Sequence, residues 1–183
     1  MNKRGIVWKI AYLVIAAGVF LIDQVTKAWA VRTLRSGGDM PVISGFLNFA
    51  YAQNTGVAFS MLDDQGAPGR WGLSVVALIA AVLVLYFFWR TPRMDDRMLG
   101  ALALLLAGIA GNLTDRMRLG FVIDFIDVQF GSWHYPTFNI ADAAICVGAG
   151  LLILDMFLNK RKSAASDPDP HSARPPAHST DVS

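Results

Sequence analysis

Residues 71–90 read WGLSVVALIAAVLVLYFFWR, an apolar run in which Ser74 is the only polar residue before Arg90. A helix rises about 1.5 Å per residue, so a run of this length spans a hydrocarbon layer about 30 Å thick. Comparable apolar segments lie at about 8–29, 98–116 and 138–158. The 183 residues are 54% hydrophobic and 16% charged. The sequence therefore predicts an all-α integral membrane protein with four transmembrane helices.

The basic residues between these segments favour one orientation, because cytoplasmic loops carry an excess of Lys and Arg. Both termini are expected to be cytoplasmic, because three basic clusters then lie on that side of the membrane. The clusters are Lys3, Arg4 and Lys9; Arg90, Arg93 and Arg97; and Lys160, Arg161 and Lys162. The first segment, with AWA at 28–30, also resembles a cleavable secretory signal. Asp23, Gln24 and Lys27 interrupt the approach to AWA, so we expect a permanent span.

The first extracytoplasmic loop, residues 33–70, is too long for a simple turn. Its stretch PVISGFLNFAYAQNTGVAFSML alternates enough to predict short strands broken at Gly45, Asn54 and Gly56. We expect a small sheet on the outer membrane surface. The tail from residue 163 to 183 is polar and proline-rich, which predicts a disordered cytoplasmic tail after a membrane domain at 1–162.

Several classes of function lack support in the composition. A net charge of +2 gives no ground for a nucleic-acid partner. One cysteine and three histidines without ligand spacing predict no metal site and no cofactor. Cys146 could be read as a nucleophile, but apolar surroundings disfavour the thiolate, so it is interpreted as a small core residue.

The polar residues of the membrane segments gather in their outer halves: Asp23 and Lys27, then Asn112, Asp115 and Arg116, then Asn139 and Asp142. Asp23 with Lys27, and Asp115 with Arg116, could be structural ion pairs that join helices. Asp142 has no opposite charge within a helical turn, and an unpaired acid in a membrane segment points to function.

A second acid can reach Asp142, because only a short loop is expected between the third and fourth segments. The candidates are Asp124 and Asp127 in VIDFID, and the pattern alone ranks neither above the other nor excludes ordinary loop carboxylates. Two carboxylates held close share a proton, so one can activate water while the other polarises a carbonyl. This is the chemistry of an aspartic peptidase.

Five motifs occur in order: DQVTK at 23–27, NTGVAFS at 54–60, GNLTDR at 111–116, VIDFID at 122–127 and FNIAD at 138–142. Over about residues 8–160 the chain resembles the bacterial lipoprotein signal peptidases (signal peptidase II). The resemblance implies that Asp124 and Asp142 are the catalytic pair, with Asp127 outside it. It also implies a small β-rich cradle on the outer face beside the four helices.

The same resemblance implies an activity, a location and partners. Such enzymes cleave prolipoproteins before a diacylglyceryl-modified cysteine, in the bacterial inner membrane, at its outer (periplasmic) face. Sensitivity to globomycin, contact with membrane lipids and a monomeric state are expected. The resemblance assigns Asn54, Gly56, Asn112, Arg116 and Asn139 to the pocket, Asp23, Lys27 and Asp115 to its support, and Phe59 to a possible cover.

Two other classes of protein remain as alternatives. A small transporter or proton channel also uses membrane carboxylates, but it favours acids near the midplane, broken helices and internal repeats. Here the acids cluster at one face, and residues 71–90 offer little for a polar path. A structural or assembly subunit has no need of two uncompensated acids.

Overall fold

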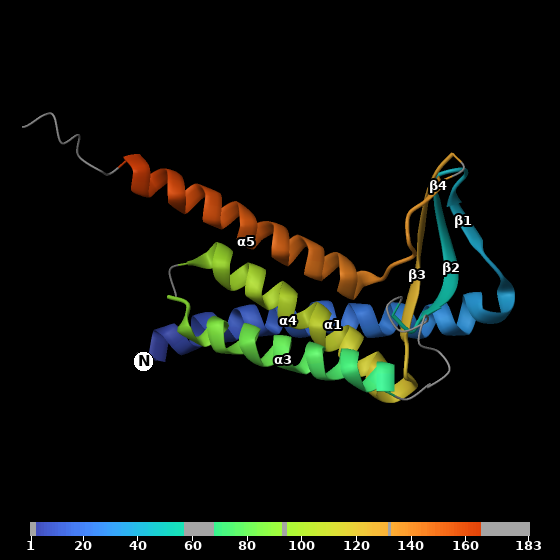
Figure 1. Ribbon diagram of the computed structural model, residues 1–183, viewed down its shortest axis with the longest axis horizontal. Helices are drawn as coiled ribbons and strands as arrows, with labels where there is room; N and C mark the ends of the chain where they lie inside the picture. The colour runs from blue at the N-terminus through green and yellow to red at the C-terminus, as the bar shows by residue number, and fades with distance from the viewer. Residues whose placement is uncertain (1–2, 57–67, 93–94, 132, 166–183) are drawn as a thin grey trace, which may run out of the picture.

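The computed structural model describes residues 3–56, 68–92, 95–131 and 133–165 (Figure 1). Its long helices are α1 (Lys3–Gly37), α3 (Pro68–Arg90), α4 (Asp96–Leu119) and α5 (Ile140–Ala165). Each of the four contains a stretch long and apolar enough to cross a membrane. The predicted membrane fold class is therefore confirmed.

Helix α4 is the centre of the bundle. Half of its most apolar stretch is buried, against 11–22% for the other three helices, and it packs against α1, α3 and α5. Leu99, Leu102 and Ala103 of α4 form the core with Ala16 of α1 and Phe88 of α3. Large apolar side chains on α1, α3 and α5 point outward, which suits a lipid environment because lipid tails are as apolar as the side chains themselves.

Small residues allow α4 and α5 to pack closely. A Cβ added at Gly148 would lie 2.8 Å from the carbonyl oxygen of Ala101, and one at Gly108 would collide with the carbonyl oxygen of Ala141. At Gly111 of α4 a Cβ would lie 2.6 Å from Oδ2 of Asp23 on α1, so a small residue is also needed where α4 meets α1. Such contacts are typical of membrane helices, whose backbones approach each other at small side chains.

An antiparallel sheet of order β1-β2-β3-β4 completes the fold. Its strands are β1 (Met40–Ile43), β2 (Leu47–Asn54), β3 (Val122–Phe130) and β4 (Trp133–His134). Gly45 turns between β1 and β2 with φ +73, and β2 ends at Asn54, as predicted. The register of β2 on β3 shifts by one residue between Phe49 and Ala52, which marks a bulge in β2.

The sheet is larger than the sequence predicted. Strands β3 and β4 come from residues 122–134, which were expected to be a short loop between the third and fourth spans. Helix α1 continues to Gly37, so the predicted loop at 33–70 begins five residues too early. Helix α5 continues to Ala165, so the expected boundary after residue 162 falls inside it. The predicted tail beyond 165 lies outside the described residues.

The sheet lies at the end of the bundle opposite the N-terminus, with its strands running across the helix axes (Figure 1). Phe125 of β3 packs on Ala30 and Leu34 of α1, together with Trp29 and Phe49. This aromatic cluster fixes the sheet to the C-terminal end of α1. The first part of β3 is thereby held beside the adjoining ends of α4 and α5.

Candidate active site

The start of α5 is built by the motif FNIAD. Asn139 precedes the helix, and its Oδ1 accepts a hydrogen bond from the backbone N–H of Asp142 at 2.9 Å. In return, Asp142 Oδ2 accepts from the backbone N–H of Asn139 at 3.2 Å. This reciprocal pattern is that of a capping box, and the helix dipole also favours an acid in the first turn. Asp142 therefore also caps the start of α5, a structural role that the search for an oppositely charged neighbour did not predict.

The other oxygen of Asp142 contacts α4. Asn112 Nδ2 donates to Asp142 Oδ1 at 2.7 Å. Asn139 Nδ2 in turn donates to Asn112 Oδ1 at 3.2 Å. The Asp142 carboxylate is thus held by Asn139, which caps α5, and by Asn112 of the neighbouring helix α4.

Asp124 reaches the same place from the sheet. Asn139 Nδ2 donates to Asp124 Oδ1 at 2.7 Å, and Asn54 Nδ2 donates to Asp124 Oδ2 at 3.0 Å. The residue is only 2% exposed. Burial and the charge of Asp142 raise the pKa of Asp124 to about 6, against the opposing effect of the two asparagine hydrogen bonds and Lys27. Asn139 therefore contacts both acids, one through its side chain and one through its backbone.

The turn after β2 orients Asn54. The backbone N–H of Gly56 donates to Asn54 Oδ1 at 2.9 Å, and Gly56 has φ +93. Both residues are turn residues, as the sequence predicted. Because Oδ1 is engaged by an N–H donor, the amide nitrogen must face Asp124.

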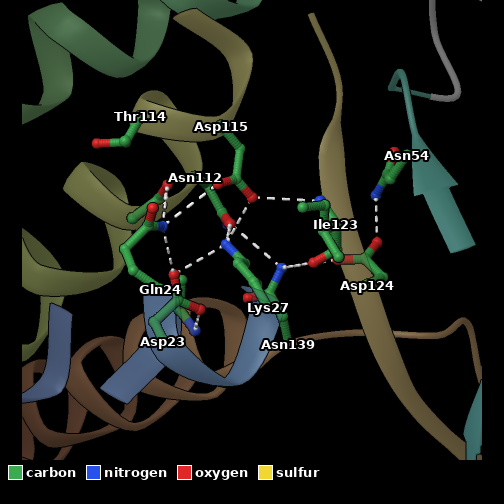
Figure 2. A network of polar contacts seen from close by, with 12 residues as sticks. Asp23, Gln24, Lys27, Asn54, Asn112, Thr114, Asp115, Ile123, Asp124 and Asn139 are labelled. Carbon is green, nitrogen blue, oxygen red and sulfur yellow. Dashed lines mark hydrogen bonds and ion pairs between the residues drawn. The ribbon is translucent and has the colours of Figure 1, made fainter. Parts of the chain in front are cut away.

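A buried ion cluster lies beside Asn139 and Asp124 (Figure 2). Lys27 is 1% exposed, and its Nζ lies 2.9 Å from both Asp23 Oδ2 and Asp115 Oδ2. It also donates to Asn112 Oδ1 at 2.9 Å. The predicted pair of Asp23 with Lys27 is present, whereas Asp115 binds Lys27 rather than its suggested partner Arg116.

Gln24 and three backbone groups complete the cluster, and none of them was predicted from the sequence to be part of the site. Gln24 Nε2 donates to Asp115 Oδ1 and to the carbonyl oxygen of Gly111, both at 3.3 Å. The backbone N–H groups of Ala141 and Ile123 donate to Asp23 Oδ1 at 2.8 Å and to Asp115 Oδ2 at 3.2 Å. Gln24 stands between Asp23 and Lys27 in a membrane segment, so its part in the cluster could have been predicted from the sequence. The contacts of the backbone N–H groups could not, because they depend on no side chain.

Asp127 has different partners. It accepts hydrogen bonds from Asn48 Nδ2 at 3.2 Å and Gln129 Nε2 at 3.1 Å, and its Oδ1 lies 3.2 Å from His134 Nδ1. Desolvation raises the pKa of Asp127, but these hydrogen bonds outweigh it and leave the pKa below its ordinary value. The hydrogen bonds of the Asp127 carboxylate are thus made within the sheet, and Asp127 is not among the residues that Asn139 contacts.

Comparison with known proteins agrees with this site. A family model described as signal peptidase (SPase) II matches residues 15–158. The chain belongs to the signal peptidase II family. Curated relatives named lipoprotein signal peptidase include that of Shewanella loihica, 40% identical over 91% of this chain and 95% of the relative. That of Pseudoalteromonas atlantica is 42% identical over 81% of this chain and 90% of the relative.

A solved structure described as a bacterial membrane enzyme, determined by the in meso method at 2.3 Å resolution, has the same fold. It is 31% identical, with a TM-score of 0.73, over 87% of this chain and 93% of that chain. The resemblance found in the five motifs is therefore confirmed, and this signal peptidase II family member is a multi-pass membrane peptidase.

The charges of this signal peptidase II site do not balance. Four carboxylates, Asp23, Asp115, Asp124 and Asp142, face two cations, Lys27 and Arg116. A buried excess of negative charge favours uptake of a proton by one acid. Arg116 Nε is buried and has no hydrogen-bond partner among the described residues. Phe59, the predicted cover, lies outside the described residues.

Proposed function

We propose that this protein is a membrane aspartic endopeptidase that removes signal peptides from prolipoproteins, cutting before the S-diacylglyceryl-cysteine. One observation carries the aspartic mechanism. Asn139 donates to Asp124 through its side chain and to Asp142 through its backbone, so two acids from different segments share one residue. The substrate class rests on the relatives, which are named lipoprotein signal peptidases.

In the proposed mechanism the acid pair begins with one proton. The ionised member, Asp124 or Asp142, takes a proton from water, whose oxygen attacks the carbonyl carbon before the modified cysteine. The protonated member donates to the carbonyl oxygen and stabilises the tetrahedral species. When the C–N bond breaks, the cysteine nitrogen takes a proton from the pair. No covalent bond to the enzyme forms.

The surrounding residues would position these groups. Asn112 and Asn139 hold the two carboxylates in place through their amides. The charge of Arg116 acts on both acids and would stabilise the negative charge that develops beside them. Asn54 and Gly56 form the turn that holds the edge of the pocket at Asp124.

The location of the acids suits a lipidated substrate. Asp124 is in β3 and Asp142 is in the first turn of α5, and these two segments meet at one end of the bundle (Figure 1). A substrate whose acyl chains remain in the bilayer presents its scissile bond at the membrane interface. We therefore propose that this end faces the periplasmic side of the inner membrane, with both termini cytoplasmic.

The test compares two forms of one prolipoprotein, with and without the diacylglyceryl group, using purified protein in detergent. Mass spectrometry of the products identifies the bond that is cut. The proposal predicts cleavage directly before the modified cysteine and little cleavage of the unmodified form. Cleavage at another bond, or equal rates for both forms, would contradict it.

A further inference from the structure

Lys27 makes one contact more than a link between helices requires. An ammonium group has three N–H donors. Two of them meet Asp23 on its own helix and Asp115 on α4, each at 2.9 Å. These contacts account for the joining of α1 to α4. The third donor meets Asn112 Oδ1, also at 2.9 Å.

This third contact decides which way the Asn112 amide points. An ammonium group can only donate, so the amide oxygen must face Lys27 and the amide nitrogen must face away. Asn139 Nδ2 donates to the same oxygen at 3.2 Å. With its oxygen held by two donors, Asn112 turns its nitrogen to Asp142 Oδ1 at 2.7 Å. Lys27 thus acts on Asp142 through one intervening side chain, that of Asn112.

The charge of Lys27 also acts on the acid pair. The pair is Asp124 of β3 and Asp142 of α5, and the charged groups that face it are Asp23 and Lys27 of α1 and Asp115 and Arg116 of α4. The triad of Lys27 with two carboxylates carries one net negative charge. Removing the cation makes this charge more negative, whereas removing one acid neutralises it.

We propose that Lys27 is a positioning residue for the acid pair: it orients Asn112 and, with Asp23 and Asp115, sets the pH range in which the pair holds one proton. This inference rests on the proposed aspartic mechanism and goes beyond the joining of helices. If the triad only joined the helices and its charge did not reach the acid pair, removing Lys27 or Asp115 would leave that pH range unchanged.

The experiment measures kcat and KM against pH for Lys27→Met, Asp115→Asn and the double variant. Loss of the cation strengthens proton binding by the pair, so Lys27→Met should move the alkaline limb up by about one pH unit. Asp115→Asn should move the same limb down by about one unit. The double variant restores the net charge, so its limb should return toward that of the wild type. Loss of Asn112 orientation should lower kcat more than it changes KM.

Asp127→Asn is the matched control, because it removes a carboxylate of β3 whose partners are Asn48, Gln129 and His134. Its pH profile should equal that of the wild type. Unchanged limbs in the folded variants of Lys27 and Asp115, or shifts in the same direction, would overturn the inference. Lys27→Met leaves two buried acids without a cation and can fail to fold, in which case Asp115→Asn decides by the direction of its shift.

The two proposals can fail separately. If Asp124→Asn or Asp142→Asn still cleaves at the wild-type rate, the aspartic mechanism is wrong and the inference falls with it. If both lose cleavage while the pH limbs of the Lys27 and Asp115 variants stay unchanged, only the inference is wrong.

Discussion

Two glycines of α5, two residues apart, should respond oppositely to the same substitution. At Gly148 an added Cβ would lie 2.8 Å from the oxygen of Ala101, 2.9 Å from Cγ of Leu105 and 3.1 Å from the nitrogen of Leu105. Two of these atoms belong to the backbone of α4, so that helix must shift to make room. At Gly150 no described atom lies within 4 Å of the added Cβ.

The expected magnitudes follow from two opposing effects. Alanine is better than glycine in a helix by about 1 kcal/mol, and overpacking a tight contact costs about 1–3 kcal/mol. Gly148→Ala should therefore lower the free energy of unfolding by up to about 2 kcal/mol, whereas Gly150→Ala should raise it by up to about 1 kcal/mol. For a chain of this length these changes correspond to a Tm lower by up to about 8 °C and higher by up to about 4 °C.

Thermal unfolding of both variants in one detergent, followed by intrinsic tryptophan fluorescence, measures the difference. The five tryptophans provide the signal. The wild type should melt between the two variants. A Gly148→Ala protein that melts at or above the temperature of Gly150→Ala would refute the close packing of α4 and α5.

Three further predictions concern individual side chains. The pKa of Asp124 is raised to about 6, so the pair loses its proton as pH rises through that value, and kcat/KM should fall above it. Asn54→Ala removes a hydrogen-bond donor to the Asp124 carboxylate, so the pH at which kcat/KM falls should rise by about one unit. Asp127→Asn should cleave within about twofold of the wild-type rate, since its partners are in the sheet; a loss of a hundredfold would contradict this. Lys9 Nζ donates to the carbonyl oxygens of Phe88 and Trp89 at 3.0 and 2.7 Å. Lys9→Met should therefore destabilise the protein by about 1–3 kcal/mol in thermal unfolding. The rate of cleavage per folded molecule should stay unchanged.

The membrane spans and the grouping of polar residues could be predicted because both depend on local sequence. A run such as 71–90 has one stable solution in a bilayer, a helix. Asp23 and Lys27 are four residues apart on one helix, so their pair follows from helix geometry. Asn54 and Gly56 carry turn chemistry that is readable without a partner.

What the sequence did not predict depends on contacts between distant segments. Strand β3 contains two acids, and it is a strand because it pairs with β2, about seventy residues earlier in the chain. Asp115 binds Lys27 of α1 instead of the adjacent Arg116, which depends on how α1 and α4 pack. The reciprocal bonds of Asn139 and Asp142 are local, and the spacing of the two residues could have predicted them.

The central claim is that Asp124 and Asp142 act as one catalytic unit. The most direct test is the rate of prolipoprotein cleavage by Asp124→Asn, Asp142→Asn and the double variant, each checked for wild-type thermal unfolding. Each single variant should lose at least about a thousandfold in rate, and the double variant should be no slower than either, because residues that act as a unit are not additive. A folded single variant that keeps cleavage within tenfold of the wild type would contradict the claim.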